Sequence, residues 1–112
     1  MKFLFVCSQN RLRSPTAEAV FSNHPGIEAM SAGTNHDAEN PVSLDLIEWA
    51  DCVLVMEKKH KNKLIKRFKS AFKTKKLVVL DIPDKYEYME PELISILKAK
   101  MDRYIRIKVM RE

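Results

Sequence analysis

Residues 3–15 read FLFVCSQNRLRSP, a short apolar run followed by a polar loop and the pair Ser14-Pro15. The apolar run is typical of a buried strand, which we expect to span Lys2–Val6. Ser is a preferred N-cap and Pro suits the first helical position, so a helix is predicted from Pro15 to about Asn23. A strand, a tight loop and a helix start together form a cradle for an anion, because loop N–H groups and the helix dipole point into it.

The rest of the chain repeats this alternation of strands and helices. Apolar runs and helical spacing predict strands at Ile27–Ser31, Cys52–Met56 and Leu77–Leu80, and helices at Val42–Trp49, Lys58–Phe68 and from Pro91 onward. Such an order implies right-handed crossovers and a parallel sheet covered on both faces. We therefore predict an α/β fold in a single domain, residues 1–112. Its architecture would be three-layer α/β/α with a four-stranded parallel sheet, of the flavodoxin or Rossmann-like kind. A terminal strand over Tyr104–Val109 is the less favoured alternative to a helical end.

Composition narrows the class of protein. The chain has 112 residues and is 46% hydrophobic, with a formal net charge of +5. No segment approaches the roughly 20 apolar residues that span a bilayer, so we expect a soluble, cytoplasmic protein without a membrane partner. Its two cysteines, Cys7 and Cys52, lie far apart in the sequence and are expected to be free thiols.

Much of the positive charge lies in the Lys-rich segment Lys58–Lys76. The simpler interpretation is a solvated helix face, with Leu64, Ile65 and Phe68 turned toward the core. The functional interpretation is a field that attracts phosphorylated or nucleic-acid partners.

Three loops are predicted to meet at one edge of the sheet. In parallel α/β sheets, ligands bind beyond the carboxyl ends of the strands. The Cys7–Arg13 loop, the pair Met56-Glu57 and the acidic loop Asp81–Tyr88 all follow predicted strands. The topology therefore brings the Cys–Arg loop and the acidic loop together.

Cys7 and Arg13 suit attack on a phosphate. A free Cys is usually a small buried hydrophobe, but an anion-binding loop beside a helix start and an Arg favours the nucleophilic thiolate. Arg13, which is separated from Cys7 by five residues, can grip two phosphate oxygens. The predicted phosphate-binding residues are Ser8, Gln9, Asn10, Arg11, Leu12, Arg13 and Ser14.

Two loop residues are expected to shape this cradle. Asn10 tolerates the left-handed backbone that converging N–H groups require. Ser14 is either a plain N-cap or a hydroxyl donor to the Cys7 thiolate.

The reaction also needs an acid, because an ester oxygen leaves slowly unless it is protonated. Asp84, in the loop after the last strand, is the candidate. Asp81 is the alternative, being nearer to the strand end and better placed to cap the loop. Tyr86 and Tyr88 are expected either to line the cleft and stack on an aromatic leaving group, or simply to pack.

These residues resemble the low-molecular-weight protein tyrosine phosphatase family. The likeness extends from the Phe3–Phe21 opening to the segments Ser31–Thr34, Trp49–Glu57 and Pro83–Tyr86. It implies a two-step, metal-free mechanism without a cofactor. In the first step Cys7 attacks phosphorus and Asp84 protonates the leaving group.

The same resemblance implies a network of Asn10, Ser14 and Ser31 that shapes the loop, which His36 would join. The chain departs from the family in four places. Leu12 stands where many members have a second Cys, and the region between Thr34 and Trp49 is short. Gln9 stands where the family usually has Gly, and Lys85 stands where it often has Pro.

Three functions are compatible with the sequence. The first is a phosphomonoester hydrolase that acts on phosphotyrosine through a phosphocysteine and releases inorganic phosphate. The second is an arsenate reductase, since that activity occurs on a similar scaffold; an external thiol would then have to assist. A non-catalytic phosphate or nucleic-acid binder ranks last, because a binder needs no nucleophile.

Overall fold

The computed structural model describes residues 1–111, and the side chains of residues 1–105. Strands and helices alternate along the chain, as the sequence predicts. In order, the elements are β1 (Lys2–Cys7), α1 (Arg13–Phe21), β2 (Glu28–Gly33), α2 (Leu44–Trp49), β3 (Cys52–Val55), α3 (Lys58–Arg67), the 3-10 turn η1 (Ala71–Lys73), β4 (Lys76–Val79) and α4 (Pro91–Arg111).

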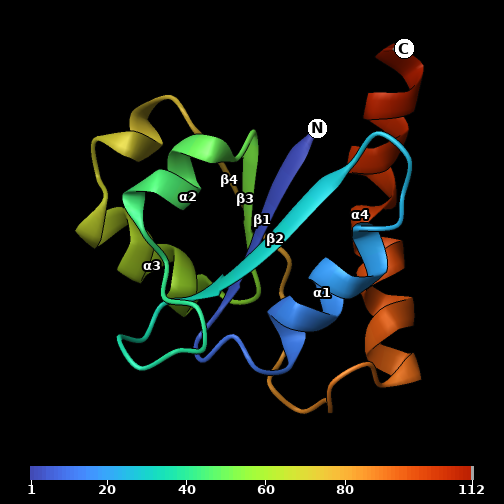
Figure 1. Cartoon of the computed structure of the whole chain (residues 1–112), viewed down its shortest axis with the longest axis horizontal. Helices are drawn as coiled ribbons and strands as arrows, with labels where there is room; N and C mark the ends of the chain where they lie inside the picture. The colour runs from blue at the N-terminus through green and yellow to red at the C-terminus, as the bar shows by residue number, and fades with distance from the viewer. Residues whose placement is uncertain (112) are drawn as a thin grey trace.

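The strands form one parallel sheet in the order β2-β1-β3-β4, with β1 near its centre (Figure 1). The register aligns Cys7 with Gly33 on β2, and Val6 with Val55 on β3. The carboxyl ends of β1, β2 and β3 therefore lie at one edge, where the loops that follow them meet.

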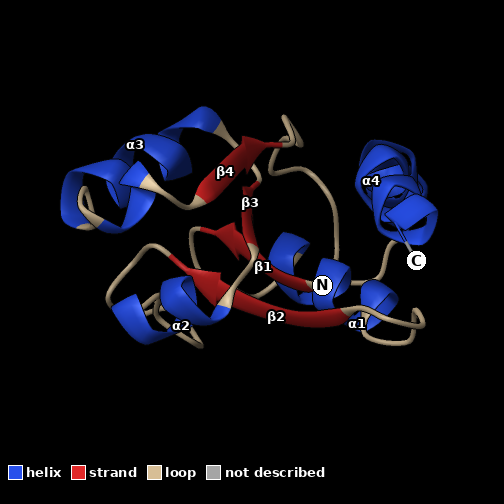
Figure 2. Ribbon diagram, turned by 90° about the horizontal axis from the view of Figure 1, so that it is seen from above, coloured by secondary structure: helices blue, strands red, loops and turns tan. Residues whose placement is uncertain are grey.

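Two apolar cores lie on the two faces of the sheet. Because side chains alternate along a strand, Phe3, Phe5 and Cys7 face one side of β1 while Leu4 and Val6 face the other. The first face packs against α1 and α4, and the second against α2 and α3 (Figure 2). This confirms the predicted α/β/α arrangement around a four-stranded parallel sheet.

The start of the first helix differs from the prediction. α1 begins at Arg13, and Leu12 is its N-cap without a side-chain hydrogen bond, so Ser14 is not the cap and Pro15 is the third helical residue. Thr16 supplies the local stabilisation, because both its N–H and its hydroxyl donate to the Leu12 carbonyl. The Ser14 hydroxyl is thereby free for another role.

Two further expectations about helices are wrong. Ile65 is 36% exposed and does not face the core, because it follows buried Leu64 by a rotation of about 100° around the α3 axis. The second inward position on α3 is taken by His60, which is fully buried. The alternative of a strand over Tyr104–Val109 is also wrong, since α4 continues to Arg111.

Among residues 1–111, no helix is both long and apolar enough to cross a membrane.

Candidate active site

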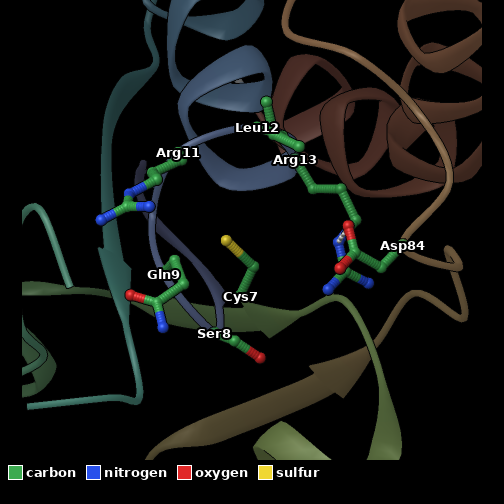
Figure 3. A pocket seen from close by; sticks show the side chains of 7 residues that line it. All are labelled: Cys7, Ser8, Gln9, Arg11, Leu12, Arg13 and Asp84. Carbon is green, nitrogen blue, oxygen red and sulfur yellow. Dashed lines mark ion pairs between the residues drawn. The ribbon is translucent and has the colours of Figure 1, made fainter. Parts of the chain in front are cut away.

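The loop between β1 and α1 forms the floor of a pocket at the carboxyl edge of the sheet (Figure 3). The pocket is lined by Cys7, Ser8, Gln9, Arg11, Leu12, Arg13 and Asp84. Six of these residues come from the predicted phosphate loop, and Asp84 comes from the loop after β4. The structure thus brings together two segments that are about 70 residues apart in the sequence.

The carbonyl groups of the loop bond to the segment that follows β2. The Cys7 carbonyl accepts from the N–H of Thr34 at 2.9 Å, and the Ser8 carbonyl accepts from that of Asn35 at 3.1 Å. Asn10 has a φ of 58°, the left-handed conformation predicted for it. Because these carbonyls are engaged from outside the pocket, the loop N–H groups remain available to an anion within it.

Gly33 allows these two segments to approach each other. A Cβ atom at this position would lie 2.5 Å from the Ser8 carbonyl oxygen and 2.5 Å from the Cβ of Ala38. Glycine is therefore required because the loop backbone packs directly on the end of β2.

Ser14 is the centre of a buried hydrogen-bond chain that includes Cys7. Its hydroxyl lies 2.9 Å from the Cys7 Sγ, and the Asn10 side-chain amide donates to that same hydroxyl at 2.9 Å. The single Ser14 hydroxyl proton has two acceptors within reach, the sulfur at 2.9 Å and the Ala32 carbonyl at 3.4 Å. The shorter contact with the sulfur is compatible with the alternative in which Ser14 donates to the Cys7 thiolate.

Arg13 is almost fully buried and is held from two sides. Its Nη1 donates to Glu57 Oε2 at 2.6 Å and to the Ile82 carbonyl at 2.7 Å. Its Nε lies 3.8 Å from Asp84 Oδ1, so the Nε edge of the guanidinium faces the pocket. With Nη1 engaged, the Nε–Nη2 edge remains for a bidentate contact with a phosphate.

The acid loop is attached to α1 at two points. One is the Arg13 bond to Ile82, and the other is the N–H of Met89, which donates to the Thr16 hydroxyl at 2.9 Å. Asp84 lies between these anchors and lines the pocket, whereas Asp81 is not among the lining residues. The geometry therefore favours Asp84 over Asp81 as the acid.

The two tyrosines of the acid loop do not line the pocket. Tyr86 is 5% exposed and belongs to the apolar core beneath the sheet, so its predicted role as a cleft wall is wrong. Tyr88 is 53% exposed. Tyr86 lies in the core and not in the cleft wall because packing there removes more of its apolar ring surface from water than an open cleft would.

Two residues implied by the resemblance lie outside the loop network. The Ser31 hydroxyl donates to Glu18 Oε1 at 2.7 Å, so it supports α1 and does not contact the phosphate loop. His36 is exposed and lines a separate hollow with Lys63 and Arg67. Neither side chain has the position that the resemblance implied.

Two residues receive no functional role from the sequence: Glu57, which is predicted only to lie at the shared edge of the sheet, and His60. Glu57 binds Arg13, and the Arg13 hydrogen bond lowers the pKa of the Glu57 carboxyl. His60 Nε2 lies 2.9 Å from the Ser8 hydroxyl. The available signals were the position of Glu57 at the carboxyl end of a strand and the three-residue spacing of a capping box.

Cys52 lies at the opposite end of the sheet from Cys7. It pairs with Phe3 in the β1–β3 register, four residues before Cys7, a separation of about 13 Å along the strand. Burial raises the pKa of its thiol to about 11. Cys52 is therefore neither near enough nor sufficiently ionised to resolve an adduct on Cys7, which argues against an arsenate reductase that uses an internal thiol.

No group of His, Cys, Asp and Glu in the described part of the chain has the size and geometry to hold a metal ion.

Known proteins with the same architecture are phosphatases. No protein-family model matches the chain. A protein-arginine-phosphatase from Geobacillus stearothermophilus is 31% identical to this chain, and the match covers 62% of this chain and 64% of the relative. The match therefore spans a little less than two thirds of that relative's length.

Solved structures match over nearly the whole chain. The YwlE arginine phosphatase from Geobacillus stearothermophilus has a TM-score of 0.78 at 24% identity, with 99% of this chain and 96% of that chain covered. The tyrosine phosphatase Wzb from Escherichia coli K30, in complex with phosphate, has a TM-score of 0.74 at 21% identity, with 92% and 94% covered. A low-molecular-weight phosphotyrosine phosphatase from Vibrio cholerae O395 has a TM-score of 0.75 at 15% identity, with 99% and 98% covered.

The chain has the fold of low-molecular-weight phosphatases. The fold that the resemblance implied is thereby confirmed, and the curated relative and these structural neighbours are phosphatases. Proteins with this fold include some described as arginine phosphatases and others described as tyrosine phosphatases. The shared fold therefore leaves the choice of phosphorylated residue to the lining of the pocket.

Proposed function

We propose that the protein hydrolyses phosphate monoesters through a phosphocysteine intermediate on Cys7. The observation that carries this proposal is the shared pocket of Cys7, Arg13 and Asp84, which are a nucleophile, an oxyanion clamp and an acid. Metal-independent phosphoryl transfer needs these functions within reach of one phosphorus atom.

In the first step, the Cys7 thiolate attacks phosphorus and the bond from phosphorus to the leaving oxygen breaks. Asp84 donates its proton to that oxygen, while Arg13 and the loop N–H groups hold the remaining phosphoryl oxygens. In the second step, water attacks phosphorus and Asp84 takes the water proton. The sulfur–phosphorus bond breaks and inorganic phosphate leaves, and the Ser14 hydroxyl stabilises the returning thiolate.

Phosphotyrosine is the substrate class we favour, and the charge of Arg11 supports this choice. Arg11 lines the pocket with its side chain 60% exposed, and its ion pair with Glu39 is a loose contact at 3.6 Å. A phosphoarginine substrate would bring a second guanidinium group toward this cation. A phosphotyrosine ring carries no positive charge, so it avoids this repulsion.

Phosphoarginine is the second candidate, because the curated relative is a protein-arginine-phosphatase. The two candidates differ in the effect of removing the Arg11 charge. Arg11→Thr should improve hydrolysis of a phosphoarginine peptide relative to a phosphotyrosine peptide of the same sequence.

Hydrolysis of an aryl phosphate by wild-type protein, Cys7→Ser and Cys52→Ser tests the proposed reaction. We expect turnover by the wild type and by Cys52→Ser, and no detectable turnover by Cys7→Ser. Trapping of a phosphorylated protein on rapid acid quench should likewise require Cys7. Wild-type-like turnover by Cys7→Ser would refute the proposed reaction.

A further inference from the structure

His60 is a fully buried polar side chain that lies beside the phosphate loop. Its Nδ1 accepts a hydrogen bond from the backbone N–H of Glu57 at 3.0 Å, which closes the capping box at the start of α3. Its Nε2 lies 2.9 Å from the hydroxyl of Ser8, the first loop residue after Cys7. The imidazole thus joins the helix cap to the floor of the pocket.

These contacts fix the position of the His60 proton. A backbone N–H can only donate, so Nδ1 must carry a lone pair and no hydrogen. A neutral imidazole then carries its hydrogen on Nε2, and that N–H must donate to the Ser8 oxygen. Burial and the Arg13 charge lower the pKa of His60 to about 4, so this neutral form holds at physiological pH.

The direction of this bond determines what the Ser8 hydroxyl can do. Its oxygen accepts from His60, which leaves its own O–H as a donor. Ser8 lines the same pocket as Cys7 and Arg13 (Figure 3). An anion in that pocket offers acceptors to this O–H.

Glu57 extends the arrangement to the other end of the loop. Its backbone N–H orients His60, and its carboxylate accepts from Arg13 at 2.6 Å. The beginning and the end of the Cys7–Arg13 loop are therefore both held by the first turn of α3.

We propose that His60 is a positioning residue of the phosphate loop, whose Nε2–H orients the Ser8 hydroxyl so that it donates to a phosphoryl oxygen in the pocket. This inference rests on the proposed function for the identity of its ligand, a phosphoryl group. It concerns the binding of that ligand and does not require turnover.

Two substitutions at His60 separate its cap from its contact with Ser8. Asn places an acceptor where Nδ1 lies, so His60→Asn keeps the bond from the Glu57 N–H and loses the donor to Ser8. Gln places an amide nitrogen where Nε2 lies, so His60→Gln keeps the donor and loses the cap. If His60 has only a structural role, His60→Gln should weaken phosphate binding more than His60→Asn does. The proposed role predicts the reverse, because His60→Asn is the variant that loses the donor to Ser8.

Calorimetric titration with inorganic phosphate at pH 7 is the test, with thermal melting recorded for each variant. Loss of a hydrogen bond to a charged group should weaken phosphate binding by roughly ten-fold or more in both His60→Asn and Ser8→Ala. The double variant should be no weaker than either single variant, because both remove the same contact. His60→Gln should keep most of the affinity but melt at a lower temperature.

Four outcomes would overturn the proposal. They are unchanged phosphate affinity in His60→Asn, unchanged affinity in Ser8→Ala, additive losses in the double variant, and greater weakening in His60→Gln than in His60→Asn. The ¹⁵N resonances of His60 in the wild-type protein give an independent check that needs no variant to fold. Nε2 should carry the hydrogen, and a hydrogen on Nδ1 would exclude the proposed orientation.

The proposed reaction and this inference fail in distinguishable ways. If phosphate binding depends on His60 and Ser8 while Cys7→Ser retains turnover, the positioning role stands and the phosphocysteine mechanism falls. If Cys7 is essential but His60→Asn binds phosphate as the wild type does, only the positioning role falls.

Discussion

Arg13 donates to Glu57 Oε2 across 2.6 Å, although the Arg13 side chain is only 2% exposed. A buried guanidinium that loses its carboxylate partner is left with an incompletely compensated charge. We therefore expect Glu57→Gln to lower the free energy of unfolding by roughly 1–3 kcal/mol at pH 7, and to weaken phosphate binding. Urea denaturation checks the first effect. A variant as stable as the wild type would show that the Ile82 carbonyl and the Asp84 carboxylate suffice for Arg13.

The same pair makes a prediction about acid stability. The Arg13 hydrogen bond holds the pKa of Glu57 below its ordinary value of 4.5. A carboxyl with a depressed pKa in the folded state stabilises the protein fully above its unfolded value and loses that effect as the pH falls through the folded value. The stability difference between wild type and Glu57→Gln should therefore be constant above about pH 5 and shrink below pH 4.5.

His60 should produce a second pH dependence in a higher window. Its pKa falls from 6.5 to about 4 on folding, mainly through burial, so between these values the unfolded chain binds more protons. Stability should consequently decline as the pH is lowered from 6.5 toward 4, by on the order of 3 kcal/mol in total. Urea titrations of wild type and His60→Asn across this range provide the measurement. If the free energy of unfolding changed equally with pH in the two proteins, the claim that His60 is buried in its neutral form would be contradicted.

Asp84→Asn should slow the chemical step without preventing phosphate binding. A general acid contributes on the order of a hundred-fold or more, and more for poor leaving groups than for good ones. We expect kcat/KM to fall strongly with phenyl phosphate and less with p-nitrophenyl phosphate. Asp81→Asn is the matched control, because Asp81 is exposed and absent from the pocket lining. A larger loss of activity in Asp81→Asn than in Asp84→Asn would identify Asp81, and not Asp84, as the general acid.

Oxidation of Cys7 should be hard to reverse. Leu12 lies at the pocket position where the resemblance implies a second Cys in many proteins of this type, and Cys52 lies at the far end of the sheet. After brief peroxide treatment, a reductant should restore little phosphatase activity to the wild type. Leu12→Cys should recover substantially more activity, and Cys52→Ala should behave as the wild type does. Full recovery in the wild type would indicate that another group protects the oxidised thiol.

The parts that the sequence predicts well are those defined by local pattern. β1, the loop and α1 adjoin one another, so the relation of Cys7 to Arg13 is already present in their spacing. Parallel topology then places Asp84 at the same edge, because every parallel strand ends there. These inferences need no knowledge of which side chains touch.

The parts that sequence reasoning missed depend on side-chain contacts between distant segments. His60 and Ser8 are 52 positions apart, and a His in a Lys-rich helix gives no sign that it is buried. Ser31 is expected to join the loop network, but its hydroxyl donates instead to Glu18 on α1. Tyr86 turns into the core, where its ring loses more contact with water than it would in an open cleft.

The outer wall of the loop, formed by the N–H groups of Thr34 and Asn35, makes the anion site a property of the whole native sheet. A peptide that contains only the Cys7–Arg13 motif has nothing to hold its carbonyls away from the ligand. Phosphate is therefore a ligand of the native state alone, and it should raise the melting temperature by an amount that grows with the logarithm of its concentration above the Kd. In a collection of variants, that rise reports which variants retain an assembled loop, whether or not they can still turn over substrate.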